Sequence, residues 1–146
     1  MKRAFILLTA LACAPTQRNV RLVSPDTMSP ARGYSHVAVV SGGRTIYVSG
    51  QVPVDKDGHL VGGDDLGAQS RQVFENMKAA LAAADATMAD VVKVTVFLKD
   101  ASQVDKFRAV RNEYFKSDWP TSSAVEVRAL LRPEWLLEVD AIAIAK

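Results

Sequence analysis

Apolar residues recur at helical spacing in two segments of the chain, and both segments predict amphipathic helices. The first helix should begin at Asp64 and Asp65, whose carboxylates suit a helix N-terminus, and end near Asp85. Its predicted buried stripe is Leu66, Val73, Phe74, Met77 and Leu81. The second helix follows a weaker capping box, Ser102 with Asp105. Its predicted buried stripe is Val104, Phe107, Val110, Tyr114 and Phe115.

Runs rich in β-branched and apolar residues predict the strands, at 20–23, 36–40, 45–49, 91–98, 122–128 and 136–145. The run 91–98 is apolar on both faces, which is typical of a central, covered strand, and a capping box of Thr87 with Asp90 predicts a short turn before it. Glycines 42 and 43 between the second and third runs indicate a hairpin.

The predicted order of elements is β-β-β-α-β-α-β-β. This order favours an α+β fold in which one mixed sheet carries both helices on one face. The opposite face of that sheet is still partly apolar, so we expect it to be covered by association of subunits.

Length and composition agree with one globular domain, which we place at residues 15–146 of the 146. Apolar residues make up 49% of the chain and charged residues 23%. The 18 Lys and Arg against 16 Asp and Glu give a net charge of +2, and the chain has neither a basic run nor alternating aromatic and basic residues. This charge pattern argues against a nucleic-acid partner.

The first fourteen residues, MKRAFILLTALACA, differ in kind from the rest. Two cations precede an apolar run that has the length of a signal h-region and is too short to span a bilayer. We interpret residues 1–14 as a targeting segment for export, and cleavage after Ala12 would place Cys13 where bacterial lipoproteins carry their lipid. The alternatives are a plain signal peptide and an uncleaved apolar start on a cytoplasmic protein.

Five segments, in order, resemble the RidA (YjgF) family of reactive-intermediate deaminases, and the similarity covers residues 21–146. They are GYSHVAVV, IYVSGQVPVD, GGDDLGAQSRQVFENMKAAL, VVKVTVFLKD and LLEVDAIAIA. The resemblance implies a chorismate-mutase-like fold and a homotrimer with ligand clefts between its subunits. It implies hydrolysis of imines and enamines in active members, and no metal or organic cofactor.

The resemblance also implies positions for the ligand. Tyr34 matches an aromatic residue placed against the ligand, and Ser49 with Gly50 matches the Ser-Gly-Gln turn beside it. Glu138 matches the acidic residue that positions the hydrolytic water. The stretch between Glu126 and Glu138 is one residue longer than in typical deaminases, which predicts a bulge or a longer turn near Arg132 and Pro133.

The stretch PTSSAVEV is where the chain departs from the family pattern. Deaminating members read proline, a small residue, arginine, serine and cysteine, whereas Ser122 stands here in place of the arginine and Ala124 in place of the cysteine. That arginine is understood to hold the substrate's carboxylate through a bidentate pair, which a hydroxyl cannot copy. Arg108 and Arg128 are the candidates for a substitute cation.

Two function classes therefore stay open for this small-molecule pocket. The first is an imine or enamine hydrolase with an altered substrate preference, and the second is a trimeric ligand-binding or chaperone-like protein without turnover. A Ser-His hydrolase is disfavoured because no base is visible near Ser122 in the sequence. His36 and His59 have no spacing with cysteine or acidic residues that predicts a metal site.

Overall fold

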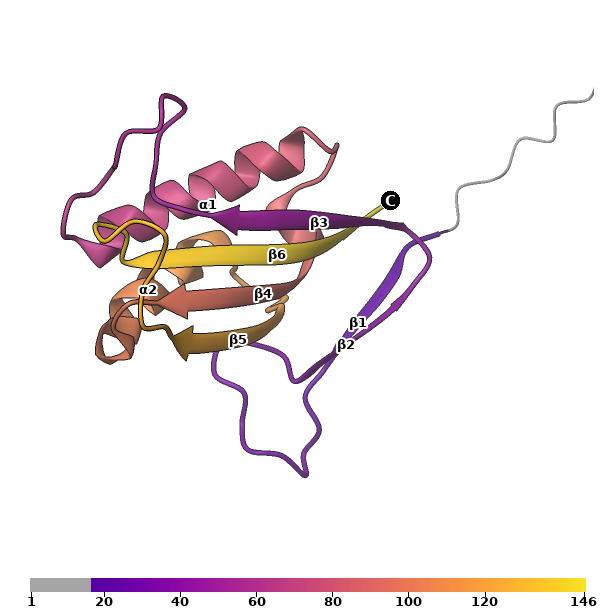
Figure 1. Ribbon diagram of the computed structural model, residues 1–146. Helices are drawn as coiled ribbons and strands as arrows, with labels where there is room; N and C mark the ends of the chain where they lie inside the picture. The colour runs from indigo at the N-terminus through magenta and orange to yellow at the C-terminus, as the bar shows by residue number, and fades with distance from the viewer. Residues whose placement is uncertain (1–16) are drawn as a thin grey trace, which may run out of the picture.

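The computed structural model describes residues 17–146, so the predictions for the targeting segment and for Cys13 lie outside the described residues. Four strands form a mixed sheet in the order β3-β6-β4-β5. They are β3 (Arg44–Gln51), β4 (Val91–Leu98), β5 (Thr121–Glu126) and β6 (Leu137–Ala145). Two helices, α1 (Leu66–Ala82) and α2 (Val104–Tyr114), lie on one face of this sheet (Figure 1). The predicted order of elements, the mixed sheet and the placement of the helices are confirmed.

Helix α1 begins where its sequence supplies a cap. The Asp65 carboxylate accepts hydrogen bonds from the backbone N–H groups of Gly67 at 2.7 Å and Ala68 at 3.3 Å, which satisfies donors that the first turn leaves without partners. The predicted apolar stripe is buried as expected. The chain leaves the helix at Asp85, whose φ of 50° is in the left-handed region.

Strand β4 has the central position that its sequence predicts, between β6 and β5. The pairing is antiparallel with β6 and parallel with β5, and the parallel connection runs through α2. Only one face of β4 is fully buried, because Val94, Val96 and Leu98 lie under the helices while the alternate residues are part-exposed. The covered position is therefore confirmed for one face only.

The two predicted capping boxes differ in outcome. Thr87 and Asp90 form the capping box at η1 (Met88–Asp90). Before the second helix, Asp100 caps η2 (Ala101–Gln103) by accepting from the Ser102 backbone N–H at 2.9 Å, and α2 itself begins after Gln103 without a side-chain cap. The prediction of Ser102 with Asp105 was wrong because Asp105 instead pairs with Arg108 one turn later, at 3.0 Å.

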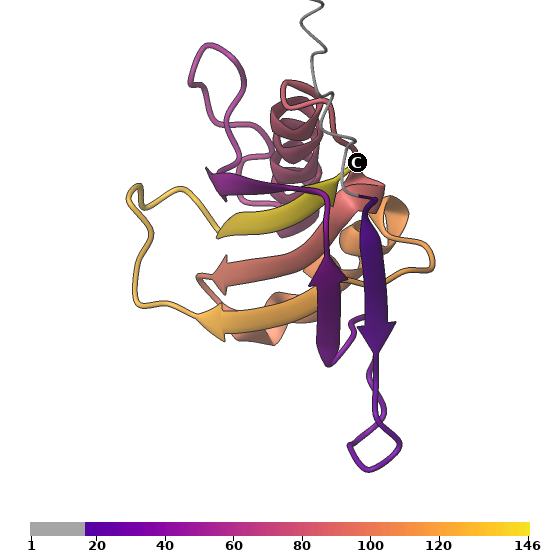
Figure 2. The ribbon, with the colours of Figure 1, turned by 90° about the vertical axis from the view of Figure 1, so that its right-hand side faces the viewer.

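The predicted hairpin at Gly42 and Gly43 was also wrong. Strand β2 (Val37–Ser41) pairs with β1 (Asn19–Val23) in a separate two-stranded ribbon, whereas β3 pairs with β6. Both glycines have positive φ, 67° and 80°, so the chain turns a corner there and passes from one sheet to the other. The ribbon lies beside one end of the larger sheet and runs across its strands (Figures 1 and 2).

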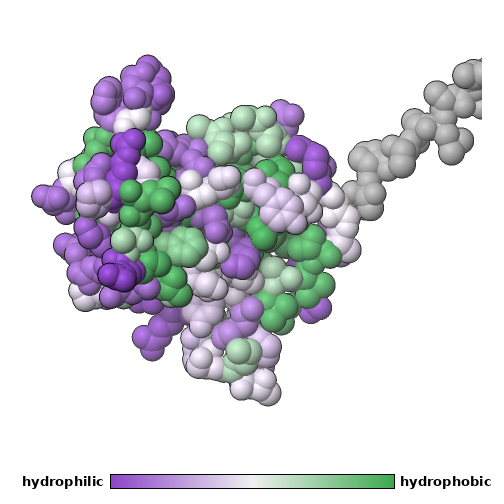
Figure 3. Space-filling model, viewed as in Figure 1, coloured by the Kyte–Doolittle hydropathy of each residue, from purple (hydrophilic) through white to green (hydrophobic). Residues whose placement is uncertain are grey.

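The face of the larger sheet opposite the helices has no cover within residues 17–146. Tyr47 on this face is 79% exposed and Val125 is 47% exposed. Figure 3 looks onto this face, which we call the open face, and shows apolar residues mixed with polar ones. No helix within residues 17–146 is long and apolar enough to cross a membrane.

Candidate functional site

The predicted site residues divide between the two faces of the sheet. Ser122 pairs with Val94 in the β4–β5 register, so its side chain and that of Ala124 point to the helix side. Glu138 pairs with Phe97 and points to the open face, since its neighbours Leu137 and Val139 belong to the core. A single chain therefore does not bring Ser122 and Glu138 into one cleft.

Tyr34 is held against the start of β5 by its neighbour Ser35. The Ser35 backbone N–H donates to the Pro120 carbonyl at 3.1 Å, and its hydroxyl donates to the Trp119 carbonyl at 2.7 Å. A short parallel bridge between Ser35 and Thr121 continues the contact. Tyr34 therefore lies beside Ser122, whereas Ser49 and Gly50 line neither of the two hollows that these residues share.

Tyr34 and Ser122 line a cavity of about 220 Å³ between β5 and α2. We call it the α2 cavity. Its wall also includes Ala124 from β5, Val104 and Phe107 from α2, and three cationic side chains, Arg32, Arg108 and Arg111. The cavity thus combines an apolar base with an unusual concentration of positive charge.

Arg111 was not singled out from the sequence, yet among residues 17–146 it is the most deeply buried cation. It is 7% exposed, and its guanidinium carbon lies 5.0 Å from the centre of the Trp119 ring, in cation–π contact. On another side it meets the backbone of Gly33, where a Cβ would lie 3.1 Å from the guanidinium carbon and closer still to one of its nitrogens. The signal was available, because residues 104, 107, 111 and 114 follow helical spacing and an arginine stands where the stripe requires an apolar residue.

The other two candidate cations are less well placed. Arg108 lines the α2 cavity but is exposed and paired with Asp105. Arg128 is exposed and follows the far end of β5, beyond Glu126.

Burial, together with the nearby charge of Arg108, lowers the pKa of Arg111 from its usual value.

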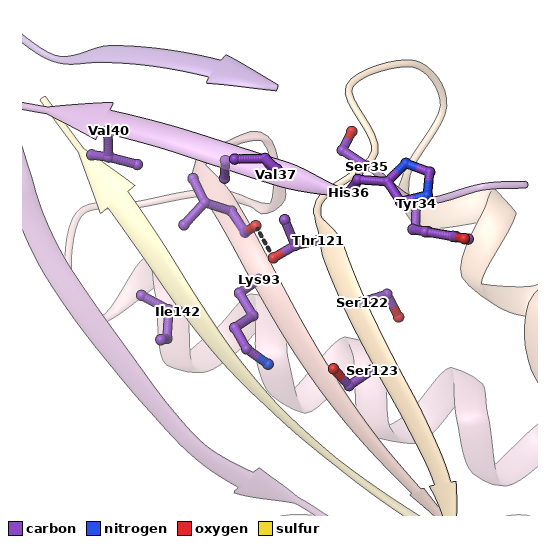
Figure 4. A pocket seen from close by; sticks show the side chains of 12 residues that line it. Tyr34, Ser35, His36, Val37, Val40, Lys93, Thr121, Ser122, Ser123 and Ile142 are labelled. Atoms are coloured by element: carbon purple, nitrogen blue, oxygen red, sulfur yellow. Dashed lines mark hydrogen bonds between the residues drawn. The ribbon is translucent and has the colours of Figure 1, made fainter. Parts of the chain in front are cut away.

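A second and larger hollow, of about 490 Å³, lies on the other side of Tyr34 and Ser122. Its wall includes His36, Lys93 and Ser123, and Figure 4 shows Ser123 and Lys93 projecting away from the side on which Ser122 and Tyr34 lie. The His36 ring meets the Tyr34 ring edge to face, with centroids 5.2 Å apart, and its buried Nδ1 has no hydrogen-bond partner within residues 17–146. No hydrogen bond joins His36 to Ser122 in that part of the chain.

On the open face, Ser49, Gly50 and Glu138 lie together. The register of β3 and β6 shifts between Val48 and Gln51, so Ser49 and Gly50 occupy a bulge beside Glu138. A Cβ on Gly50 would lie 2.7 Å from the carboxyl carbon of Glu138 and overlap one of its oxygens, so glycine at this position lets the carboxylate approach the backbone closely. The Ser49 carbonyl accepts from the Gln51 side chain at 3.0 Å, and its exposed hydroxyl is free to meet a ligand.

One cluster with the donor types of a metal site was missed in the sequence. Asp55, Asp57 and His59 each place one ligand atom within 4.8 Å of the others. Asp55 already accepts from the backbone N–H groups of Asp57 and His59, and Asp57 is paired with Lys56 at 2.9 Å. The His59 backbone hydrogen bond, with that from Asp57, lowers the pKa of Asp55. These contacts account for the cluster as a closed loop tip around Gly58.

Comparison with known proteins identifies the family of the chain. The profile of the family described as Endoribonuclease L-PSP matches residues 24–145. A RutC family protein of Pyrococcus horikoshii is 44% identical over 123 residues, covering 84% of this chain and 94% of its own. The human 2-iminobutanoate/2-iminopropanoate deaminase is 35% identical over 122 residues, covering 83% of this chain and 84% of its own.

The fold also matches solved structures. The structure of YyfB, a member of the conserved Rid protein family from Yersinia pestis, superposes with a TM-score of 0.80 at 37% identity. The match covers 86% of this chain and 98% of that protein. The chain belongs to the RidA (YjgF) family.

Proposed function

We propose that this protein hydrolyses small imines or enamines to carbonyl compounds, at sites formed between copies of the chain. The observation that carries the proposal is the Glu138 carboxylate held beside the Gly50 bulge on the open face. A carboxylate at a bulge whose glycine allows close approach is a suitable group to orient a water molecule. The human relative that shares 35% identity is named as a deaminase of 2-imino acids, which supports the same chemistry.

The division of the site between two faces supports assembly. Tyr34 and Ser122 lie on the helix side at the β5 edge, and Glu138 lies on the open face. A neighbouring copy packed on the exposed apolar residues of the open face would bring its own β5 edge toward Glu138. A trimer closes such a heterologous contact into a ring, so each cleft takes residues from two subunits.

The reaction requires no cofactor to balance. An iminium carbon and one water molecule give a carbonyl compound and an ammonium ion. As the water oxygen bonds to carbon, Glu138 accepts a proton from the water and returns it to the nitrogen, after which the C–N bond breaks with its electron pair leaving on ammonia. The carbinol hydroxyl gives up its proton as the carbonyl forms, and ammonia carries that proton away.

Ser122 sets the expected substrate preference of this branch. A hydroxyl cannot replace a guanidinium as the bidentate partner of a carboxylate. Hydrogen bonds to charged groups contribute about 1.5 to 3 kcal/mol, which corresponds to roughly 10 to 200-fold in transition-state binding. The substrate therefore either lacks an essential carboxylate or has its carboxylate held by another group.

The test is the decay of imines generated in situ from amino acids and from amines by the matching oxidases, with semicarbazide trapping the imine that remains. We expect turnover by the wild type and a loss of about 10² to 10⁴-fold in Glu138→Gln. Asp140→Asn is the matched control, because Asp140 is a carboxylate on the same face of β6. Light scattering should give three times the mass of one chain.

Two results would count against the proposal. A stable monomer at micromolar concentration would leave Glu138 without the other half of its site. A wild-type trimer with no turnover on either imine would favour the ligand-binding alternative.

A further inference from the structure

We propose that Arg111 of α2 supplies the guanidinium that binds the substrate's carboxylate, in place of the charge that Ser122 lacks. The ligand of the α2 cavity is then a short-chain 2-imino acid, or the 2-oxo acid that its hydrolysis yields. The assignment of an imino group rests on the proposed function, whereas the assignment of a carboxylate rests on the cavity alone.

The guanidinium of Arg111 has contacts on two sides before any ligand arrives. Trp119 lies 5.0 Å from its carbon on one side, and the Gly33 backbone, whose φ is 72°, approaches on another. A side chain at Gly33 would occupy the space of the guanidinium. A long side chain that is already ordered loses little conformational entropy on binding, which favours its use as an anchor.

The hydrogen bonds of Arg111 are incomplete in a way that suits an anion. Its Nε and Nη2 donate to the Asn112 side-chain oxygen at 3.3 and 3.0 Å. Its Nη1 makes no hydrogen bond within residues 17–146, and no carboxylate in that part of the chain pairs with Arg111. A buried charge without a counterion is costly, and an anionic ligand in the cavity would remove that cost.

The other walls select the size and shape of the anion. The cavity of about 220 Å³ is smaller than the usual pocket for a drug-sized ligand. Val104, Phe107 and Ala124 offer contact to a short aliphatic chain, and Tyr34 and Ser122 offer hydroxyl groups at its edge. Arg32 and Arg108 add positive charge to the wall, with Arg108 paired to Asp105. A planar carboxylate on a short chain satisfies all of these features.

Ser122 has a role in this arrangement that does not depend on charge. Its side chain points into the same cavity as Arg111, so the small residue leaves room for the carboxylate to reach α2. One guanidinium is enough to bind one carboxylate in a cavity of this size, and it can come from position 122 of β5 or from Arg111 of α2. Arginine at 122 would therefore duplicate Arg111 in the wild type and could replace it only where Arg111 is removed.

The probe is pyruvate, a stable analogue of 2-iminopropanoate, with its affinity for the full chain measured by calorimetry and compared with that of acetone, its uncharged counterpart. We expect Arg111→Met to weaken pyruvate binding roughly 10 to 200-fold, since one charged hydrogen-bonding group is lost, and to leave acetone unchanged. Arg128→Met is the matched comparison and should change pyruvate affinity less than about twofold. Ser122→Arg in the Arg111→Met background should restore pyruvate binding.

Equal pyruvate affinity in the wild type and Arg111→Met, or a loss caused by Arg128→Met instead, would overturn the proposal. If Arg111→Met does not fold, Ser122→Arg in the otherwise wild-type chain tests the proposal instead. We expect pyruvate affinity to rise by less than about threefold, because Arg111 already binds the carboxylate. A rise of about tenfold or more would show that no arginine binds the carboxylate in the wild type.

The two proposals can fail separately. Pyruvate binding that depends on Arg111, without imine turnover, would reject the hydrolase and retain the anion site. Imine turnover that is unchanged in Arg111→Met would retain the hydrolase and reject the anion site.

Discussion

Helices α1 and α2 pack side by side on the same face of the sheet, and each buries one large polar side chain. Gln69 of α1 is fully buried, and three partners within the chain satisfy it. Its amide donates to the carbonyls of Gly63 at 2.5 Å and Glu134 at 3.0 Å, and its oxygen accepts from the Leu136 N–H at 2.8 Å. Arg111 of α2 carries a full charge, and within residues 17–146 its one hydrogen-bond partner is the Asn112 side chain.

The difference separates a structural polar group from one directed at a ligand. Gln69 ties α1 to the two loops that precede α1 and β6, so its hydrogen bonds are used in folding. Arg111 lines the α2 cavity, and its Nη1 makes no hydrogen bond within residues 17–146. Buried groups that keep unused hydrogen-bonding capacity are candidates for function.

The most direct test of this comparison is a substitution to methionine on each helix, at Gln69 and at Arg111. Gln69→Met should cost about 2 to 4 kcal/mol of unfolding free energy, because it leaves buried backbone groups without partners. Arg111→Met should change stability by less than about 1 kcal/mol, since the lost stacking on Trp119 is offset by removal of an uncompensated charge. Denaturant unfolding measures both, and an equal cost for the two variants would make Arg111 a structural residue.

A second pair of variants tests whether Gly33 shapes the position of Arg111. Gly33→Ala and Gly58→Ala each force alanine to positive φ, 72° and 83°, at about 1 kcal/mol of strain. Only at Gly33 does the added Cβ meet another group, the guanidinium, because nothing lies within 4 Å of the site at Gly58. Gly33→Ala should therefore destabilise more than Gly58→Ala and should also weaken pyruvate binding. Equal stability and equal pyruvate affinity in the two variants would contradict this close approach.

The smallest expected effect concerns the contact between the helices. Burial, with the hydrogen bond that Tyr114 donates to the Glu75 carboxylate at 2.9 Å, raises the pKa of Tyr114 to about 12. In the unfolded chain the phenol titrates near 10, so the unfolded state loses its proton first as the pH rises. Stability from this group should be complete below about pH 10 and fall between about pH 10 and 12. Chemical unfolding across this pH range should show a smaller fall in the free energy of unfolding for Tyr114→Phe than for the wild type. An identical fall in both proteins would show that Tyr114 does not cause it.

Much of the fold could be predicted because its signals are local. The spacing of Leu66, Phe74 and Leu81 defines α1, and the run from Val91 to Leu98 defines β4 with the bounds that the structure gives. The hairpin at Gly42 and Gly43 was wrong because the choice of strand partners is not local. Two glycines support a tight turn and a corner between sheets equally well.

The candidate site was harder to predict than the fold. The resemblance identified Tyr34, Ser122 and Glu138, but the opposite faces of Ser122 and Glu138 follow from the pairing register, which a sequence does not state. Arg111 was missed because a single charged residue within an apolar stripe is usually read as exposed. Its burial depends on Trp119 and Gly33, which lie far from α2 in the sequence or outside its helical pattern.

The most direct test of the account is a crystal structure of the protein with pyruvate. We expect a trimer in which the carboxylate of pyruvate lies about 2.7 to 2.9 Å from the guanidinium nitrogens of Arg111, with Glu138 of a neighbouring copy facing its carbonyl carbon. Pyruvate bound elsewhere, with its carboxylate on Arg128 or on no arginine while Arg111 keeps its contact with Asn112 alone, would contradict it.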